Sequence, residues 1–252
     1  MSHVNFPYAR IPLVVFALVA VAWGVWTFPT FWQQSSDESV ARQIISGSPY
    51  KLEALLRLKQ DLEAVEQSPY CRASATRSAA VIRLRIAEQT ILTGDAKRID
   101  NEFDALRKSL FSTLSCSPAD PFSWLALFWL NNIQNGFSAE NLRYLRLSYR
   151  LGANEGWIAL KRNHISFSIF EALEPDLAEM TITEFLQLLD TGLYVEVADI
   201  LTGPAWRVRE SILPRLTQVP LRNREVLATV LGNRGENVSV PGVLEQGFNP
   251  WR

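Results

Sequence analysis

Residues 117–162 read SPADPFSWLALFWLNNIQNGFSAENLRYLRLSYRLGANEGWIALKR and predict three helices separated by two turns. Asp120 and the proline after it mark a helix start, because the carboxylate can accept backbone N–H groups and proline suits the first helical position. Gly136 and Gly152 are placed to end the first two helices, and Ser138 is placed to begin the second. The stretch therefore predicts two helical hairpins that share a helix.

The same helix signals continue on both sides of this stretch. Ser48 and Ser68, each followed by proline, begin helices upstream, and Thr181 opens a capping box downstream. No segment shows convincing strand alternation, so we expect an all-α fold over residues 33–232. Residues 233–252 are rich in glycine and proline and predict an extended tail, which either packs back on the helices or binds a partner.

A short pattern repeats within residues 117–162, which we call the organising stretch. The sequence Trp-Leu-Ala-Leu at 124–127 recurs as Trp-Ile-Ala-Leu at 157–160, a step of about 33 positions. This pattern resembles the tetratricopeptide repeat family, and Tyr144 falls near the aromatic position of its second helix. The resemblance implies antiparallel helix hairpins stacked as an α-solenoid, with a concave surface that binds a partner. Phe128 and Lys161 depart from the family, which has a small residue there.

The N-terminal region contains a long apolar run. Residues 11–32 carry no charged side chain, and at about 1.5 Å per residue they are long enough to cross a hydrocarbon core of about 30 Å. We therefore expect a transmembrane helix that contacts the lipid bilayer. Its C-terminal end carries an aromatic belt of Trp23, Trp26, Phe31 and Trp32. The alternative is a signal peptide cleaved after the small residues near Ala22.

Two cysteines suggest a covalent link. Cys71 and Cys116 lie at nearly equal distances on either side of a turn predicted at Gly94 and Asp95, so the open end of an antiparallel hairpin would bring them together. We favour a disulfide, which fits an oxidising compartment. The alternative is two separate buried thiols. The chain has no CxxC sequence, which argues against a redox-active pair or a metal site.

Aromatic and basic residues of the organising stretch are the candidate partner-binding residues. Arginines recur on one face of the second predicted helix, where they form a basic stripe that could hold an acidic segment or an anionic glycan. Tryptophans at the repeated positions either line a groove or pack between helices. The predicted set is Trp124, Trp157, Arg143, Arg146 and Arg150.

Composition and motifs favour a non-catalytic protein. The net charge is −1, so the chain lacks the excess of positive charge that is typical of nucleic-acid-binding proteins. His164 is the only histidine outside the N-terminal tail, so metal centres and histidine proton relays lack partners, and we expect no cofactor. Glu210-Ser211 is similar to the Glu-Ser pair of lytic transglycosylases, but the glycine-rich sequence that follows in that family is missing here.

These features predict a membrane-anchored scaffold. Residues 1–10 would be cytoplasmic, 11–32 would span the bacterial inner membrane, and 33–232 would form a periplasmic domain followed by the tail at 233–252. The scaffold would bind a protein partner in or near that membrane during cell-envelope assembly, such as polysaccharide synthesis or export. The alternatives are a glycan-binding or glycan-cleaving domain, and a small accessory subunit that acts through its transmembrane helix.

Overall fold

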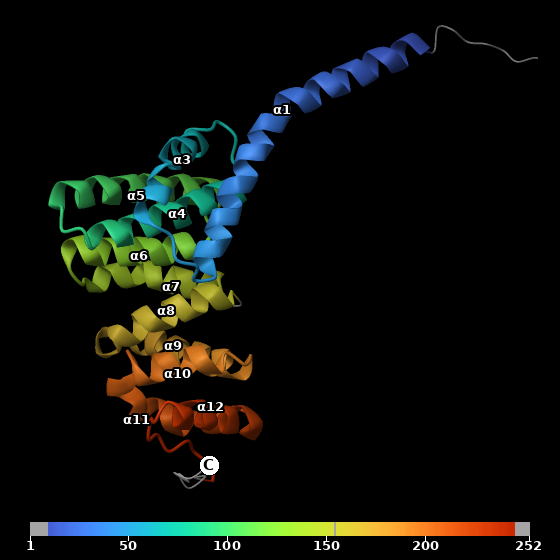
Figure 1. Ribbon diagram of the computed structural model, residues 1–252. Helices are drawn as coiled ribbons and strands as arrows, with labels where there is room; N and C mark the ends of the chain where they lie inside the picture. Colours follow the sequence, from blue (N-terminus) through green and yellow to red (C-terminus); the bar gives the residue numbers. More distant parts are fainter. Residues whose placement is uncertain (1–9, 154, 245–252) are drawn as a thin grey trace, which may run out of the picture. The chain divides into compact units, whose positions relative to one another are not determined.

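The computed structural model describes residues 10–153 and 155–244, apart from the side chains at 10, 11 and 26–36. Every regular element in this part of the chain is a helix (Figure 1), so the all-α prediction is confirmed there. The chain divides into two compact units, Met1–Cys116 and Ser117–Arg252. We call them unit 1 and unit 2.

Unit 1 is organised around one long, small-residue helix. Its helices are α1 (Arg10–Ile45), α2 (Leu52–Leu56), α3 (Lys59–Glu66), α4 (Ala73–Ile91) and α5 (Ala96–Cys116). The helix α4 packs against each of the other four (Figure 1). Alanines such as Ala79, Ala80 and Ala87 are buried on α4, and their small side chains allow neighbouring helices to approach closely. This explains why α4 is buried around most of its circumference.

The helices α4 and α5 form an antiparallel hairpin. Gly94 adopts a φ of 71° in the turn, and the Asp95 carboxylate accepts a hydrogen bond from the backbone N–H of Arg98 at 3.2 Å. At the open end of the hairpin Cys71 and Cys116 form the disulfide that the sequence predicts, with their Cα atoms 5.3 Å apart. The turn and the cross-link therefore close the two ends of the same hairpin.

The predicted transmembrane helix at 11–32 is wrong. In the part of the chain that the structure describes, no helix is both long enough and apolar enough to cross a membrane. The helix α1 continues from the apolar run into a polar segment that packs on α4.

The localisation derived from that helix is corrected with it. We do not retain a single-pass inner-membrane protein with a cytoplasmic N-terminus and a periplasmic domain, because no described helix provides the span. Of the predicted interface residues, Trp23 is 68% exposed. The side chains of Trp26, Phe31 and Trp32 lie outside the described residues. The predicted bilayer contact rested on the same span, and we do not propose it.

Unit 2 begins with the stretch that organises the sequence. Its longer helices are α6 (Pro121–Asn135), α7 (Leu142–Leu151), α8 (Gly156–Ser168), α9 (Pro175–Asp190), α10 (Tyr194–Thr202) and α12 (Leu221–Asn233). The shorter elements are η2 (Ala139–Asn141), η3 (Phe170–Ala172), η4 (Trp206–Val208), α11 (Arg209–Ile212) and η5 (Leu213–Gln218). The helix α6 packs against α7, and α8 packs against α9.

In residues 117–162 the helix ends follow the capping signals of the sequence, whereas Thr181, which was expected to open a capping box, lies inside α9. The Asp120 carboxylate accepts from the backbone N–H of Ser123 at 2.8 Å, which fixes the start of α6. Gly136 follows α6 with a φ of 77°, a conformation that favours glycine. Ser138 caps η2, and Gly152 follows α7. The predicted order of helices and turns is therefore confirmed.

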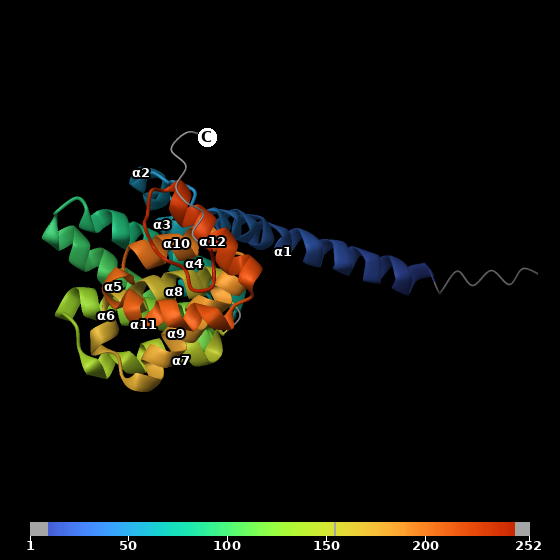
Figure 2. The same cartoon turned by 90° about the horizontal axis from the view of Figure 1, so that it is seen from below.

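The second half of unit 2 has a continuous apolar core. The helices α9, α10 and α12 pack against one another (Figure 2). The core between them contains fully buried residues that include Phe185, Leu201 and Leu227. Val240, beyond α12, is also buried in this core, so the described part of the tail packs back on the helices. Stacking of the hairpins as a tetratricopeptide-like solenoid stays a prediction.

A buried carboxylate on α1 gives unit 1 a predicted pH dependence. Asp37 is 5% exposed, and burial together with the nearby Asp61 carboxylate raises the pKa of Asp37 from 3.8 to about 6. A folded-state pKa above the unfolded value contributes stability that is complete below about pH 4 and is lost as pH rises through about 6.

We therefore expect Asp37→Asn to stabilise the protein at pH 8 by about 2 kcal/mol and to have a much smaller effect at pH 4. Urea unfolding followed by circular dichroism at both pH values measures this. Asp104→Asn changes an exposed carboxylate of α5 and serves as the control. Equal effects of Asp37→Asn at the two pH values would contradict the assignment.

Candidate functional site

Two half-buried aromatic rings form the most distinctive surface of unit 2. Trp124 on α6 and Tyr144 on α7 stack with ring centroids 6.0 Å apart and an interplanar angle of 14°. The indole N–H of Trp124 donates to the carbonyl of Pro118 at 2.8 Å, which fixes the orientation of the ring. The exposed Arg143 places its guanidinium 4.8 Å from the Tyr144 ring centroid. We call Trp124, Tyr144 and Arg143 the α6–α7 platform.

Arg143 is held loosely at the edge of the platform. Its guanidinium donates to the Tyr144 hydroxyl at 2.9 Å and lies 3.4 Å from the Glu140 carboxylate, and these contacts raise the pKa of Arg143. The Arg143 and Glu140 side chains are 59% and 75% exposed. An ion pair this exposed contributes little stability and is easily exchanged for another anion. Arg143 is therefore positioned by the ring and accessible to a partner.

Arg146, one turn further along α7, is committed to contacts inside unit 2. Its guanidinium donates to Glu174 at 2.6 Å and to both oxygens of Asp176, at 2.9 and 3.0 Å, where the chain enters α9. These bonds raise the pKa of Arg146 and lower the pKa of Asp176. These contacts join α7 to the start of α9, and the partner-binding role of Arg146 stays a prediction.

The other two predicted residues lie apart from the platform contacts. Arg150 is exposed on α7, two turns beyond Arg143. Trp157, on the first turn of α8, packs against Phe122 of α6 with ring centroids 5.4 Å apart. This contact joins α6 to α8, so Trp157 serves helix packing. The structure thus brings together Trp124 and Arg143 of the predicted set, through Tyr144.

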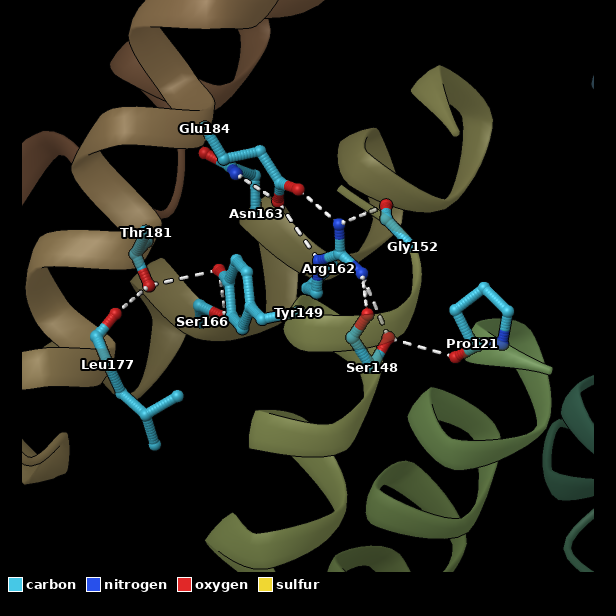
Figure 3. A network of polar contacts seen from close by, with 10 residues as sticks. All are labelled: Pro121, Ser148, Tyr149, Gly152, Arg162, Asn163, Ser166, Leu177, Thr181 and Glu184. Atoms are coloured by element: carbon cyan, nitrogen blue, oxygen red, sulfur yellow. Dashed lines mark hydrogen bonds and ion pairs between the residues drawn. The ribbon is translucent and has the colours of Figure 1, made fainter. Parts of the chain in front are cut away.

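Unit 2 contains a buried polar network that joins α7, α8 and α9 (Figure 3). Arg162 on α8 is fully buried, and its guanidinium forms a forked ion pair with the Glu184 carboxylate of α9. The same guanidinium donates to the carbonyls of Ser148 at 2.6 Å and Gly152 at 3.0 Å, at the end of α7. Asn163 donates to Glu184 at 2.8 Å.

A second branch of the network runs through Tyr149. The Arg162 guanidinium lies 4.4 Å from the Tyr149 ring centroid, and the Tyr149 hydroxyl is 3.0 Å from both Ser166 of α8 and Thr181 of α9 (Figure 3). Ser148 donates to the Pro121 carbonyl at 2.9 Å and so extends the network to α6. Four helices are therefore connected through adjacent polar groups.

Burial controls the ionisation of this network. Desolvation raises the pKa of Glu184, and the hydrogen bonds from Arg162 and Asn163 oppose the rise. Desolvation also raises the pKa of Tyr149 above its ordinary value, so the phenol stays neutral. The donors of Arg162 point at acceptors within unit 2, and these groups therefore serve structure rather than acid–base chemistry.

The remaining candidate residues do not assemble a catalytic or metal site. Among the described residues, no group of three or more His, Cys, Asp or Glu side chains could hold a metal ion. His164 is exposed on α8. The Glu210 side chain is 81% exposed and lies 3.5 Å from Arg209. The general acid of a glycan-cleaving enzyme lies in a desolvated setting, whereas Glu210 is exposed to solvent.

Three features of this region were not predicted from the sequence. The stacking of Trp124 on Tyr144 joins residues of different helices, and only the near-match of Tyr144 to the repeat pattern pointed to it. The ion pair of Arg162 and Glu184 joins residues that are far apart in sequence, without a local signal. The partners of Arg146 could have been suspected from two acidic residues flanking Pro175 at a helix start.

The buried ion pair yields a stability prediction. We expect Arg162→Met to destabilise the protein by about 3 to 5 kcal/mol at pH 8, because it leaves the Glu184 carboxylate buried without its cation. Without Arg162 the pKa of Glu184 rises further, so part of the loss is recovered at pH 5, where the carboxyl takes up a proton. Adding Glu184→Gln to Arg162→Met removes this pH dependence.

Urea unfolding at the two pH values measures these effects. Arg215→Met is the control, because Arg215 forms a similar forked pair with Glu179 on the surface, at 2.7 and 3.0 Å. Arg215→Met should lower the free energy of unfolding by less than about 1 kcal/mol. A loss for Arg162→Met no larger than that of the control would show that the buried pair does not hold these helices together.

Comparisons with known proteins gave no assignment. No family model matches this chain, and searches of curated proteins and of solved structures found no match. The resemblance to tetratricopeptide repeats therefore rests on the repeated tryptophan pattern alone and stays a prediction.

Proposed function

We propose that this chain is a non-catalytic protein-binding module and that the α6–α7 platform contacts its partner. The observation that carries the proposal is the stack of Trp124 on Tyr144 with the exposed Arg143 at its edge. Tryptophan, tyrosine and arginine are the residues that contribute most to the energy of protein interfaces. Here all three meet on a surface where each remains partly accessible.

The way in which unit 2 uses its other charges supports this proposal. Arg162 and Glu184 satisfy each other in the interior, and Arg146 is bound by Glu174 and Asp176. Arg143 has only the exposed contact with Glu140 and the Tyr144 hydroxyl.

A catalytic alternative has less support in the geometry. Glycan cleavage would require a carboxyl group in a desolvated setting, whereas Glu210 is exposed beside Arg209. The predicted setting in cell-envelope assembly stays a prediction, and the membrane anchor is no longer part of it.

A paired set of variants tests the platform. Trp124→Ala with Arg143→Ala removes it, and Trp206→Ala with Arg209→Ala removes a second exposed arginine–tryptophan pair in unit 2, with the guanidinium 4.3 Å from the ring centroid. We expect the first variant to weaken binding of the native partner by about thirtyfold or more, as for two residues at the centre of an interface. The second variant should bind like the wild type.

The partner is identified by affinity capture with the full chain from its native host, and the affinities of all three proteins for the purified partner are then measured. Circular dichroism establishes that the variants retain their helices. Equal binding by the wild type and the platform variant would contradict the proposal, and so would equal weakening by both variants.

A further inference from the structure

The disulfide of unit 1 lies at an accessible end of its hairpin. Cys71 is exposed and Cys116 is half-buried, and the neighbouring Tyr70 is 74% exposed. Cys71 precedes Arg72, the residue at the N-terminal cap of α4, and Cys116 is the last residue of α5. A disulfide buried in a core is shielded from thiols, whereas this one can be approached from solvent on the Cys71 side.

The hairpin keeps its main contacts without the covalent bond. About one turn inside the disulfide the Thr113 hydroxyl donates to the backbone carbonyl of Thr76 at 3.0 Å, and both residues are buried. Beyond that point α4 and α5 share a core that contains Ile82, Leu106 and Leu110. The cross-link therefore holds the open end, while packing holds the rest.

The disulfide joins an irregular connection to the end of a helix. Residues 67–72 form an irregular connection between α3 and α4, and the hydroxyl of Ser68 bonds with the backbone of Tyr70 within that connection. On the other side Cys116 is the final residue of unit 1, and the chain enters unit 2 at Ser117. Opening the bond would free this connection and the last turn of α5 as far as Thr113.

We infer that Cys71 and Cys116 form a reversible thiol–disulfide exchange site for a dithiol reductant, which attacks Cys71 and releases the chain at the junction after α5. The two cysteines are the substrate of the exchange and do not act as a redox catalyst, which agrees with the absence of a CxxC sequence.

The exchange proceeds in two balanced steps. A thiolate of the reductant attacks the Cys71 sulfur, the disulfide breaks, and Cys116 leaves as a thiolate that takes a proton. The second thiol of the reductant then loses its proton and attacks the mixed disulfide, which releases Cys71 as the thiol. The protein gains two electrons and two protons, and the reductant leaves as its own disulfide.

Native-state reduction of the full chain tests the accessibility of the bond. With dithiothreitol as the probe and no denaturant, we expect both cysteines to become reactive to N-ethylmaleimide while the helical circular dichroism is retained. Reduction that requires denaturant would overturn the inference, because the bond would then be shielded. Loss of the helical circular dichroism signal on reduction would also overturn the inference, because the fold would then depend on the disulfide.

The direction of attack and the local release are measured separately. A dithiol reductase whose resolving cysteine is replaced by serine should be trapped on Cys71, and trapping on Cys116 would refute the stated direction. In the reduced protein trypsin should cut after Arg72 about tenfold faster, because local opening there no longer requires breaking the cross-link.

Cleavage after Lys97, at the turn end of the same hairpin, is the internal reference and should be unchanged. Equal acceleration at both positions would indicate general unfolding and would overturn the local release. No acceleration at Arg72 would do the same, because the disulfide would then restrain nothing.

Discussion

The arrangement of unit 2 depends on the burial of one positive charge. The guanidinium of Arg162 is removed from water, and such a group is tolerated only when its charge and its donors are matched. Glu184 supplies the charge, and two carbonyls at the end of α7 accept the remaining donors shown in Figure 3. A shift of α7, α8 or α9 would leave part of this network unpaired. The pair therefore fixes the register of the helices more strictly than apolar packing does.

A glycine completes the same constraint. The carbonyl of Gly152 accepts from Arg162, and a Cβ atom at this position would lie 2.5 Å from the Cβ atom of Pro121. The end of α7 must therefore approach the start of α6 closely while it faces Arg162. Ser148 makes both contacts at once, since it donates to the Pro121 carbonyl and its own carbonyl accepts from Arg162.

The sequence predicted what depends on neighbouring residues and failed where distant groups decide the outcome. Asp120, Gly136 and Gly94 act on the adjacent backbone, so helix starts and turns could be inferred from them. The disulfide followed from symmetry about the Gly94 turn. The prediction of a transmembrane helix was wrong, because no described helix is both long enough and apolar enough to cross a membrane. In the structure α1 is one helix that joins this run to a polar segment packed on α4.

The predicted arginines show why a residue type alone does not define a binding site. Arg143, Arg146 and Arg150 share one helix, and periodicity gave them a common role. The fold separates them, because the acidic residues at the start of α9 bind Arg146, whereas Arg143 lies on the surface beside Tyr144. An arginine whose donors are already paired must lose those bonds before it binds a partner, whereas an exposed one loses little. Under the proposed function, Arg143 and the rings that position it would therefore contribute most of the binding free energy.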